Sequence, residues 1–187
     1  MIRKKFFRWI FKSELEKLEE LYRSYSIEEN KLKSAVKRTE KKYNLINNFF
    51  SLFSTGLIID IATNKRQEEL IVALTYDYCI DNKYILLYGG RYQGVSGLPR
   101  ILFKVNKQVI TGLEKKYIYI EDILMENNNI GNGTIAMNAL IKYARIINAQ
   151  WISGSLSPVD NDHAERRDHF YEKFGFIIKD SKIRLNL

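Results

Sequence analysis

The sequence predicts an α+β protein with a mixed, mostly antiparallel sheet flanked by helices and preceded by a long N-terminal helix or coiled coil. Short runs rich in β-branched and aromatic residues recur after Leu57, separated by Gly, Asn and Asp. Two helix-length segments alternate with such runs between Tyr117 and Phe176. A heptad pattern precedes them and ends near Asn47.

Composition indicates one globular domain with an appendage. The chain has 187 residues, of which 45% are hydrophobic and 13% aromatic. Its one cysteine, Cys79, has no partner for an internal disulfide, and neither a signal peptide nor an apolar run of membrane-spanning length is visible. We therefore expect a cytoplasmic protein.

The net charge of +8 is concentrated at the N-terminus. Residues 1–45 hold 13 Lys/Arg and 7 Asp/Glu, a net of +6, which leaves 17 against 15, or +2, for the other 142 residues. We divide the chain into a basic amphipathic arm, residues 1–48, and a domain, residues 49–187. The arm is predicted to contact a polyanion, either nucleic acid or an anionic membrane surface, or to form a homodimer.

Within the arm, residues 1–12 alternate cations with large apolar side chains, which suits a polyanion or packing of the apolar side chains on the protein's own core. Ser13 is the expected N-cap, with Glu16 completing a capping box, of a helix that runs to about Asn47. Eight of ten heptad a and d positions are apolar or aromatic. The ten positions are Leu15, Leu18, Tyr22, Tyr25, Glu29, Leu32, Val36, Thr39, Tyr43 and Ile46.

Two readings of this heptad segment stay open. A helical hairpin broken at residues 24–30 is possible because Ser26 and Glu29 suit the start of a second helix. The unbroken register favours one long helix. The apolar seam is expected to meet either a second chain or the protein's own domain.

Strand patterns fill the middle of the chain. A junction at residues 47–55 carries four large apolar anchors, Phe49, Phe50, Leu52 and Phe53. Predicted strands follow at 57–62, 70–80 and 84–88, the last two forming a hairpin around Asp81-Asn82, with a helix from about Asn64 as the alternative. A Gly-rich loop at 89–99 is expected to border a substrate site. A short hairpin around Asn106-Lys107 joins strands 101–105 and 108–110, and one or two closing strands occupy 176–187.

The region from Tyr117 to Ala149 has the pattern strand, tight loop, helix. The strand Tyr117–Met125 leads into Glu126–Gly133, which contains three consecutive Asn and two Gly, and then into a helix from Thr134. Asn and Gly tolerate the positive φ angles that let successive N–H groups point into one concavity. Together with the helix N-terminus, such a loop binds phosphate.

A second unit of the same kind follows. Residues 151–156 read as a strand and 162–176 as a helix that ends in aromatic residues and Gly175. The segment Phe170-Tyr171-x-Lys173-x-Gly175-Phe176 closes this unit.

These two motifs resemble the GNAT superfamily of acetyl-CoA-dependent N-acetyltransferases. Residues 128–133, Asn-Asn-Ile-Gly-Asn-Gly, resemble that family's Arg/Gln-x-x-Gly-x-Gly/Ala signature, and residues 170–176 resemble its aromatic-Tyr-x-Lys-x-Gly-Phe ending. The chain departs from the family at three places: the turn after Met125 is about two residues shorter, Asn128 replaces Arg or Gln, and Arg167 stands where a small residue is usual.

The resemblance implies that acetyl-CoA, as co-substrate, gives its acetyl group to a primary amine of unknown class by direct attack. It implies that the strand end and helix start bind the co-substrate and that Tyr171 protonates the leaving thiolate. The binding residues are Ile123, Leu124, Met125, Asn128, Asn129, Ile130, Gly131, Asn132, Gly133, Thr134 and Tyr171. The Met125 N–H is expected to polarise the thioester carbonyl.

Glu121 is the predicted general base, with attack by a free amine or through a water relay equally allowed. Because neighbouring side chains on a strand alternate, Glu121 and Asp122 are expected on opposite faces, with at most one lining the cleft. His163 and His169 are six residues apart on one helix, and with a single cysteine they form no ligand set, so we expect no metal. The alternative function is a non-catalytic adaptor that binds a ribosome, nucleic acid or membrane surface through its arm.

Overall fold

The computed structural model describes residues 11–77, 82–127, 129–157 and 164–187. The chain divides into two compact units, one ending at Ile46 and the other spanning Asn47–Leu187. No helix in the described ranges is long and apolar enough to cross a membrane.

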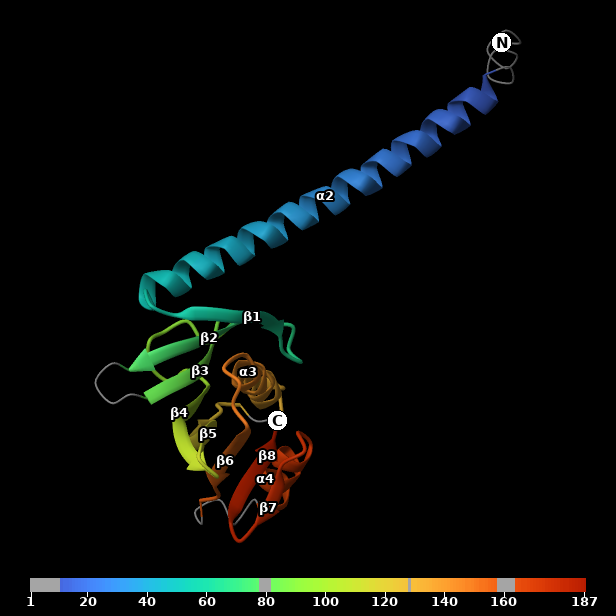
Figure 1. Cartoon of the computed structure of the whole chain (residues 1–187). Helices are drawn as coiled ribbons and strands as arrows, with labels where there is room; N and C mark the ends of the chain where they lie inside the picture. The colour runs from blue at the N-terminus through green and yellow to red at the C-terminus, as the bar shows by residue number, and fades with distance from the viewer. Residues whose placement is uncertain (1–10, 78–81, 128, 158–163) are drawn as a thin grey trace. The chain divides into compact units, whose positions relative to one another are not determined.

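The heptad segment lies in one continuous helix, α2, Lys12–Leu52 (Figure 1). This confirms the long helix over the hairpin. The predicted cap is wrong: Ser13 lies inside the helix, because the Leu15 N–H already donates to the Phe11 carbonyl at 2.9 Å. The helix also continues past Asn47 to Leu52, five residues further than predicted.

An eight-stranded sheet forms the second unit, in the order β1-β2-β3-β4-β5-β6-β8-β7. Every neighbouring pair is antiparallel except β5–β6, which is parallel, so the predicted mixed, mostly antiparallel α+β class is confirmed. The strands are β1 Leu57–Thr63, β2 Glu69–Asp77, β3 Asn82–Tyr88, β4 Arg100–Ile110, β5 Leu113–Leu124, β6 Trp151–Ser155, β7 Ile177–Lys179 and β8 Lys182–Asn186.

The hairpin between β2 and β3 is confirmed, and the alternative helix from Asn64 is wrong. Asp81, in its predicted turn, lies outside the described residues. The short hairpin around Asn106-Lys107 is also wrong, because β4 runs through both residues and turns at Thr111-Gly112. A two-residue type I′ turn needs positive φ at both positions, and φ is 51° at Thr111 and 79° at Gly112.

Two helices flank the sheet. Helix α3, Asn132–Ile146, contacts β1, β2, β3, β4 and β6, and α4, Ala164–Glu172, packs beside β7. The inward face of α3 is fully buried at Ala136, Met137 and Leu140. Burial of such apolar side chains supplies the main driving force for this packing.

The junction after the arm is anchored by Phe49. This side chain is fully buried, and its ring lies 5.2 Å from that of Phe53 and 5.7 Å from that of Tyr88. Phe50 and Leu52 remain 43% and 42% exposed, so only two of the four predicted anchors join the core directly.

Candidate active site at the divergence of β5 and β6

A cavity of about 540 Å³ opens where β5 and β6 part. The two strands pair in parallel from Tyr117–Trp151 only as far as Ile120–Gly154. Beyond that point the cavity is lined by Glu121 to Ile123 and Met125 on one side and by Ser155 to Ser157 on the other. Unpaired backbone groups at such a divergence are available to a ligand.

A β-bulge places both acidic residues of β5 on this cavity. Leu102 of β4 pairs with Asp122 and the next residue, Phe103, pairs with Ile120, so Glu121 is the extra residue. Both Glu121 and Asp122 line the cavity, and the expectation that at most one does is wrong because the bulge interrupts the alternation. Glu121 is ion-paired with Lys104 at 2.5 Å, and an Asp122 oxygen accepts the Ile123 N–H at 2.8 Å.

The loop before α3 has the conformation that its composition predicts. Asn127, Asn129 and Gly131 have φ of 57°, 69° and 94°. Gly131 is the N-cap in the left-handed region, and no described side chain caps the helix. Asn132, Gly133 and Thr134, which carry the first N–H groups of α3, line the cavity.

Four cations line the cavity: Lys65, Arg166, Arg167 and Lys173. The Lys173 ammonium donates to the Thr134 hydroxyl at 3.1 Å, and the Lys65 N–H donates to the Ile130 carbonyl at 2.9 Å. A Cβ at Gly131 would lie 3.7 Å from Lys65 Cγ, which places that side chain against the loop. Cations and helix N–H groups together attract an anion.

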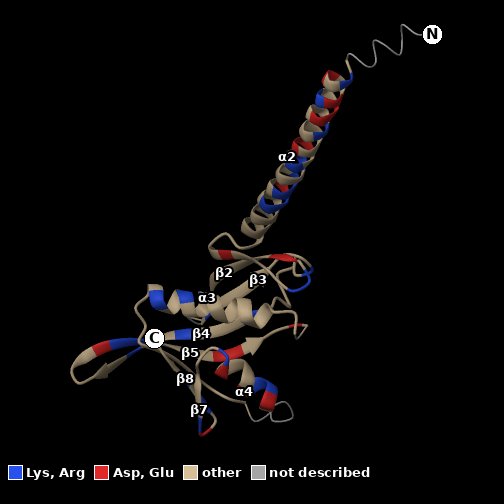
Figure 2. Cartoon of the chain, turned by 90° about the vertical axis from the view of Figure 1, so that its right-hand side faces the viewer, with Lys and Arg blue, Asp and Glu red and all other residues tan. Residues whose placement is uncertain are grey.

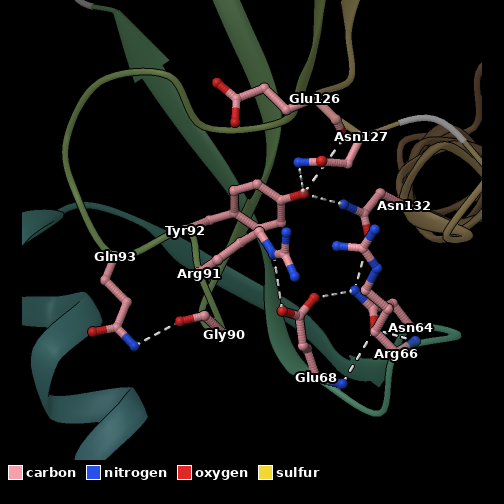
Figure 3. Close-up of polar contacts among 10 residues, drawn as sticks. All are labelled: Asn64, Arg66, Glu68, Gly90, Arg91, Tyr92, Gln93, Glu126, Asn127 and Asn132. Atoms are coloured by element: carbon pink, nitrogen blue, oxygen red, sulfur yellow. Dashed lines mark hydrogen bonds and ion pairs between the residues drawn. The ribbon is translucent and has the colours of Figure 1, made fainter.

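A polar network holds this loop against the β1–β2 turn (Figure 3). Asn64 and Asn132, only 4% and 2% exposed, lie within hydrogen-bond distance, Asn64 Nδ2 to Asn132 Oδ1, at 3.3 Å. The Asn132 amide also donates to the Tyr92 hydroxyl at 3.0 Å. Tyr92 in turn donates to the Glu126 carbonyl at 3.4 Å, so the Gly-rich loop 89–99 contacts the loop before α3, although none of its residues lines the cavity.

Glu68 completes the network. Its carboxylate accepts from the Asn64 amide at 2.7 Å and from Arg91 at 3.0 Å (Figure 3). The hydrogen bond from Asn64, supported by Arg91, holds the pKa of Glu68 below its usual value. The ionised carboxylate is thus part of the scaffold that fixes Asn64 and, through it, Asn132.

Tyr171 lines the cavity from α4 and is 8% exposed. Its ring packs edge-on against Phe170 and Phe176, with centroids at 5.3 and 5.5 Å. These ring contacts help to orient the phenol. Phe170 also touches the helix start, since a Cβ at Gly133 would lie 3.1 Å from Phe170 Cε2.

Most of the predicted binding residues meet at this cavity. It is lined by Ile123, Met125, Asn129, Gly131, Asn132, Gly133, Thr134 and Tyr171. Leu124 and Ile130 do not line it: Leu124 is 45% exposed elsewhere, and Ile130 is buried at 7%. Asn128 and His163 lie outside the described residues. The Asn132 side chain is occupied by Asn64 and Tyr92, which leaves its backbone N–H for a ligand.

Sequence analysis missed Lys65, Arg166 and the Asn64–Tyr92–Asn132 network. Arg166 could have been found from the sequence, because it precedes Tyr171 on the same predicted helix. No sequence feature links Lys65 to the site, since it lies 66 residues before Gly131 and follows an ordinary strand. Among the described residues no group of three or more His, Cys, Asp or Glu side chains suits a metal.

No protein-family model and no curated protein matches this chain. Among solved structures it is similar to two mutant forms of the BH1408 protein from Bacillus halodurans, a tetramutant and a point mutant. Identities are 17% and 16%, the TM-score is 0.44 for both, and each alignment covers 57% of this chain. The matched region spans 66% of the BH1408 chain, just under two thirds. A likeness at this level assigns no function.

Proposed function

We propose that the domain is an N-acetyltransferase that moves an acetyl group from acetyl-CoA to a primary amine by direct attack. The observation that carries this proposal is that one cavity is lined both by a helix start with several cations and by two carboxylates. The start of α3, which no described side chain caps, lines this cavity together with four cations and with Glu121 and Asp122. An anionic co-substrate and a cationic amine thus each have a complementary surface.

The residues at the helix start fit the diphosphate of acetyl-CoA. Gly131 takes a left-handed conformation, Gly133 has no Cβ between the backbone and Phe170, and Lys65 lies against the loop. When bound, acetyl-CoA supplies an activated thioester. The backbone of Asn132, Gly133 and Thr134 would hold its phosphates, with Lys65 and Lys173 neutralising their charge.

Residues at and just after the end of β5, and one residue of α4, are proposed to carry out the reaction. Glu121 and Asp122 attract the protonated amine, and Glu121 accepts one proton from it so that the neutral nitrogen attacks the thioester carbon. The C–N bond forms, the C–S bond breaks, and the second proton of the nitrogen passes to solvent. The Met125 N–H, just past the end of β5, is the donor proposed for the thioester oxygen. Tyr171 gives its phenolic proton to the leaving thiolate, since a phenol with a pKa of ~10 is protonated at neutral pH. We place this reaction in the cytoplasm.

A melting series with acetyl-CoA, CoA and an unrelated nucleotide of equal charge tests the proposal. Acetyl-CoA and CoA should each stabilise the fold by about 2.7 kcal/mol at a hundredfold excess over their dissociation constants, and the nucleotide should do much less. No shift at millimolar acetyl-CoA would sink the proposal. Release of free CoA thiol upon addition of a panel of amines then measures turnover.

A glycine pair provides the matched control. Gly133→Val should abolish the acetyl-CoA shift, because the new side chain meets Phe170 at the helix start. Gly94→Val should leave it intact, since the nearest atoms to a Cβ there are 3.7 Å away in the backbone of Ser96. Equal loss in both variants would mean that the shift does not come from this cavity.

A further inference from the structure

The apolar seam of α2 is exposed along its length. Among the heptad positions, Leu18, Tyr22, Tyr25, Leu32 and Tyr43 are between 64% and 74% exposed. Leu15 and Val36 are each 52% exposed. An exposed apolar stripe of this extent on a helix marks an interaction surface.

Charge is distributed unequally along this helix. Residues 12–30 hold three Lys/Arg and six Asp/Glu, a net of −3. Residues 31–46 hold six Lys/Arg and one Glu, a net of +5. Figure 2 shows the acidic residues of α2 in red and its basic residues in blue. A second copy of the helix complements this one only if it runs in the opposite direction, with its acidic half beside the basic half.

We infer that two copies of this chain pair through residues 12–46 of α2 as an antiparallel coiled coil. The inference does not depend on the proposed acetyl transfer. Antiparallel pairing places each a side chain opposite a d side chain of the partner. One register uses the whole seam: Leu15 then lies opposite Ile46 of the other copy, and Tyr22 opposite Thr39.

Side-chain size supports this orientation. In the antiparallel register Tyr22 faces Thr39 and Tyr25 faces Val36, so a large side chain meets a smaller one in these two layers. A parallel, in-register pair would instead set Tyr22 against Tyr22 and Glu29 against Glu29. Two facing carboxylates at a core position are destabilising, whereas antiparallel pairing sets Glu29 opposite Leu32 and leaves its ion pair with Lys33, at 2.7 Å, intact.

Sedimentation of the full chain tests the association. We expect a dimer at micromolar concentration. Leu32→Glu should weaken it at least a hundredfold, because it puts a second charge into the central layer. Ile27→Glu is the matched control, since Ile27 is 58% exposed but lies off the seam, and it should leave the dimer intact. A chain that stays monomeric at ~50 μM, or equal effects of the two variants, would overturn the inference.

Cysteine pairing tests the orientation. In a Cys79→Ser background, Leu18→Cys and Tyr43→Cys proteins are prepared separately and then mixed. Antiparallel pairing should give disulfides only in the mixture, because positions 18 and 43 face each other. Positions 18 and 18 would then lie about 38 Å apart, at 1.5 Å per residue over 25 residues. Disulfides within each separate protein would show a parallel pair and overturn the orientation. Helix content from circular dichroism confirms that each variant is folded.

Discussion

The Tyr171 ring packs edge-on against Phe170 and Phe176. The edge-on contacts with Phe170 and Phe176 remain possible for phenylalanine, so Tyr171→Phe should keep the ring packing and the acetyl-CoA affinity. Turnover should fall by about 10²–10⁴, the usual contribution of a general acid. Steady-state rates with saturating amine measure this loss.

Tyr117→Phe is the control, since Tyr117 stacks on Trp151 at 4.9 Å and is not among the cavity-lining residues. An unchanged rate for Tyr171→Phe in a chemistry-limited step would leave that residue a packing role only.

Lys65 is the cation that lies against the loop before α3, and its role is predicted to be binding rather than chemistry. Lys65→Ala should weaken acetyl-CoA about tenfold, corresponding to one charge-assisted hydrogen bond, while the rate at saturating co-substrate stays unchanged. Calorimetric titration measures the affinity. Lys182→Ala, which removes an exposed cation of the β8 strand outside the cavity, should change neither quantity. Equal affinity in the two variants would show that the diphosphate does not reach Lys65.

At the scale of elements, the β1–β2 turn and the α3 loop are joined by a network that depends on an ionised Glu68. Its pKa is lowered in the folded protein, so its contribution to stability is present above the unfolded pKa and is lost as pH falls through the folded value. The wild-type protein should therefore lose stability on acidification below about pH 4.3, the ordinary glutamate pKa, and Glu68→Gln should lack this part of the loss.

Melting temperatures between pH 7 and pH 3 measure this difference. Glu172→Gln, which changes an exposed carboxylate of α4 outside the network, should keep the wild-type pH profile. Parallel profiles for wild type and Glu68→Gln would contradict the assigned role of the ionised carboxylate.

The elements also show what could be predicted from sequence. The class, the strand before the Asn/Gly loop and the helix after it follow from local periodicity and from residues that tolerate positive φ, as Asn127, Asn129 and Gly131 do. The β4–β5 hairpin was misplaced because Asn106-Lys107 looked like a turn, although Thr111-Gly112 supplies the positive φ pair. A bulge at Glu121 carries no sequence signal, since it is defined by the partner strand.

Contacts between residues far apart in the sequence could not be predicted either, because they too depend on which elements become neighbours in the fold. Asn132 bonds to Tyr92 and Asn64, which are 40 and 68 residues away, and nothing in the local pattern marks either as a partner. The cavity could therefore be located at the helix start, while Lys65 and the network that positions the loop required the fold.

At the scale of the whole molecule, the heptad seam and the cavity belong to different compact units, which meet in sequence between Ile46 and Asn47. We therefore predict that a chain beginning at Asn47 folds, binds acetyl-CoA with the affinity of the full chain and sediments as a monomer. Phe49 must be kept, because it is fully buried and truncation of a buried Phe costs about 3–5 kcal/mol.

A second truncation, beginning at Ser54, provides the contrast. It removes both Phe49 and Phe53, whose rings stack at 5.2 Å and contact Tyr88, and it should be markedly less stable in urea than the chain that begins at Asn47. Light scattering, urea unfolding and acetyl-CoA titration measure the association, stability and co-substrate affinity of the full chain and of the chains that begin at Asn47 and Ser54. If the chain from Asn47 loses acetyl-CoA binding although the full chain binds, then residues before 47 take part in the site. In that event the apolar seam has a partner within its own domain, and the Leu32→Glu protein should show the same loss of binding.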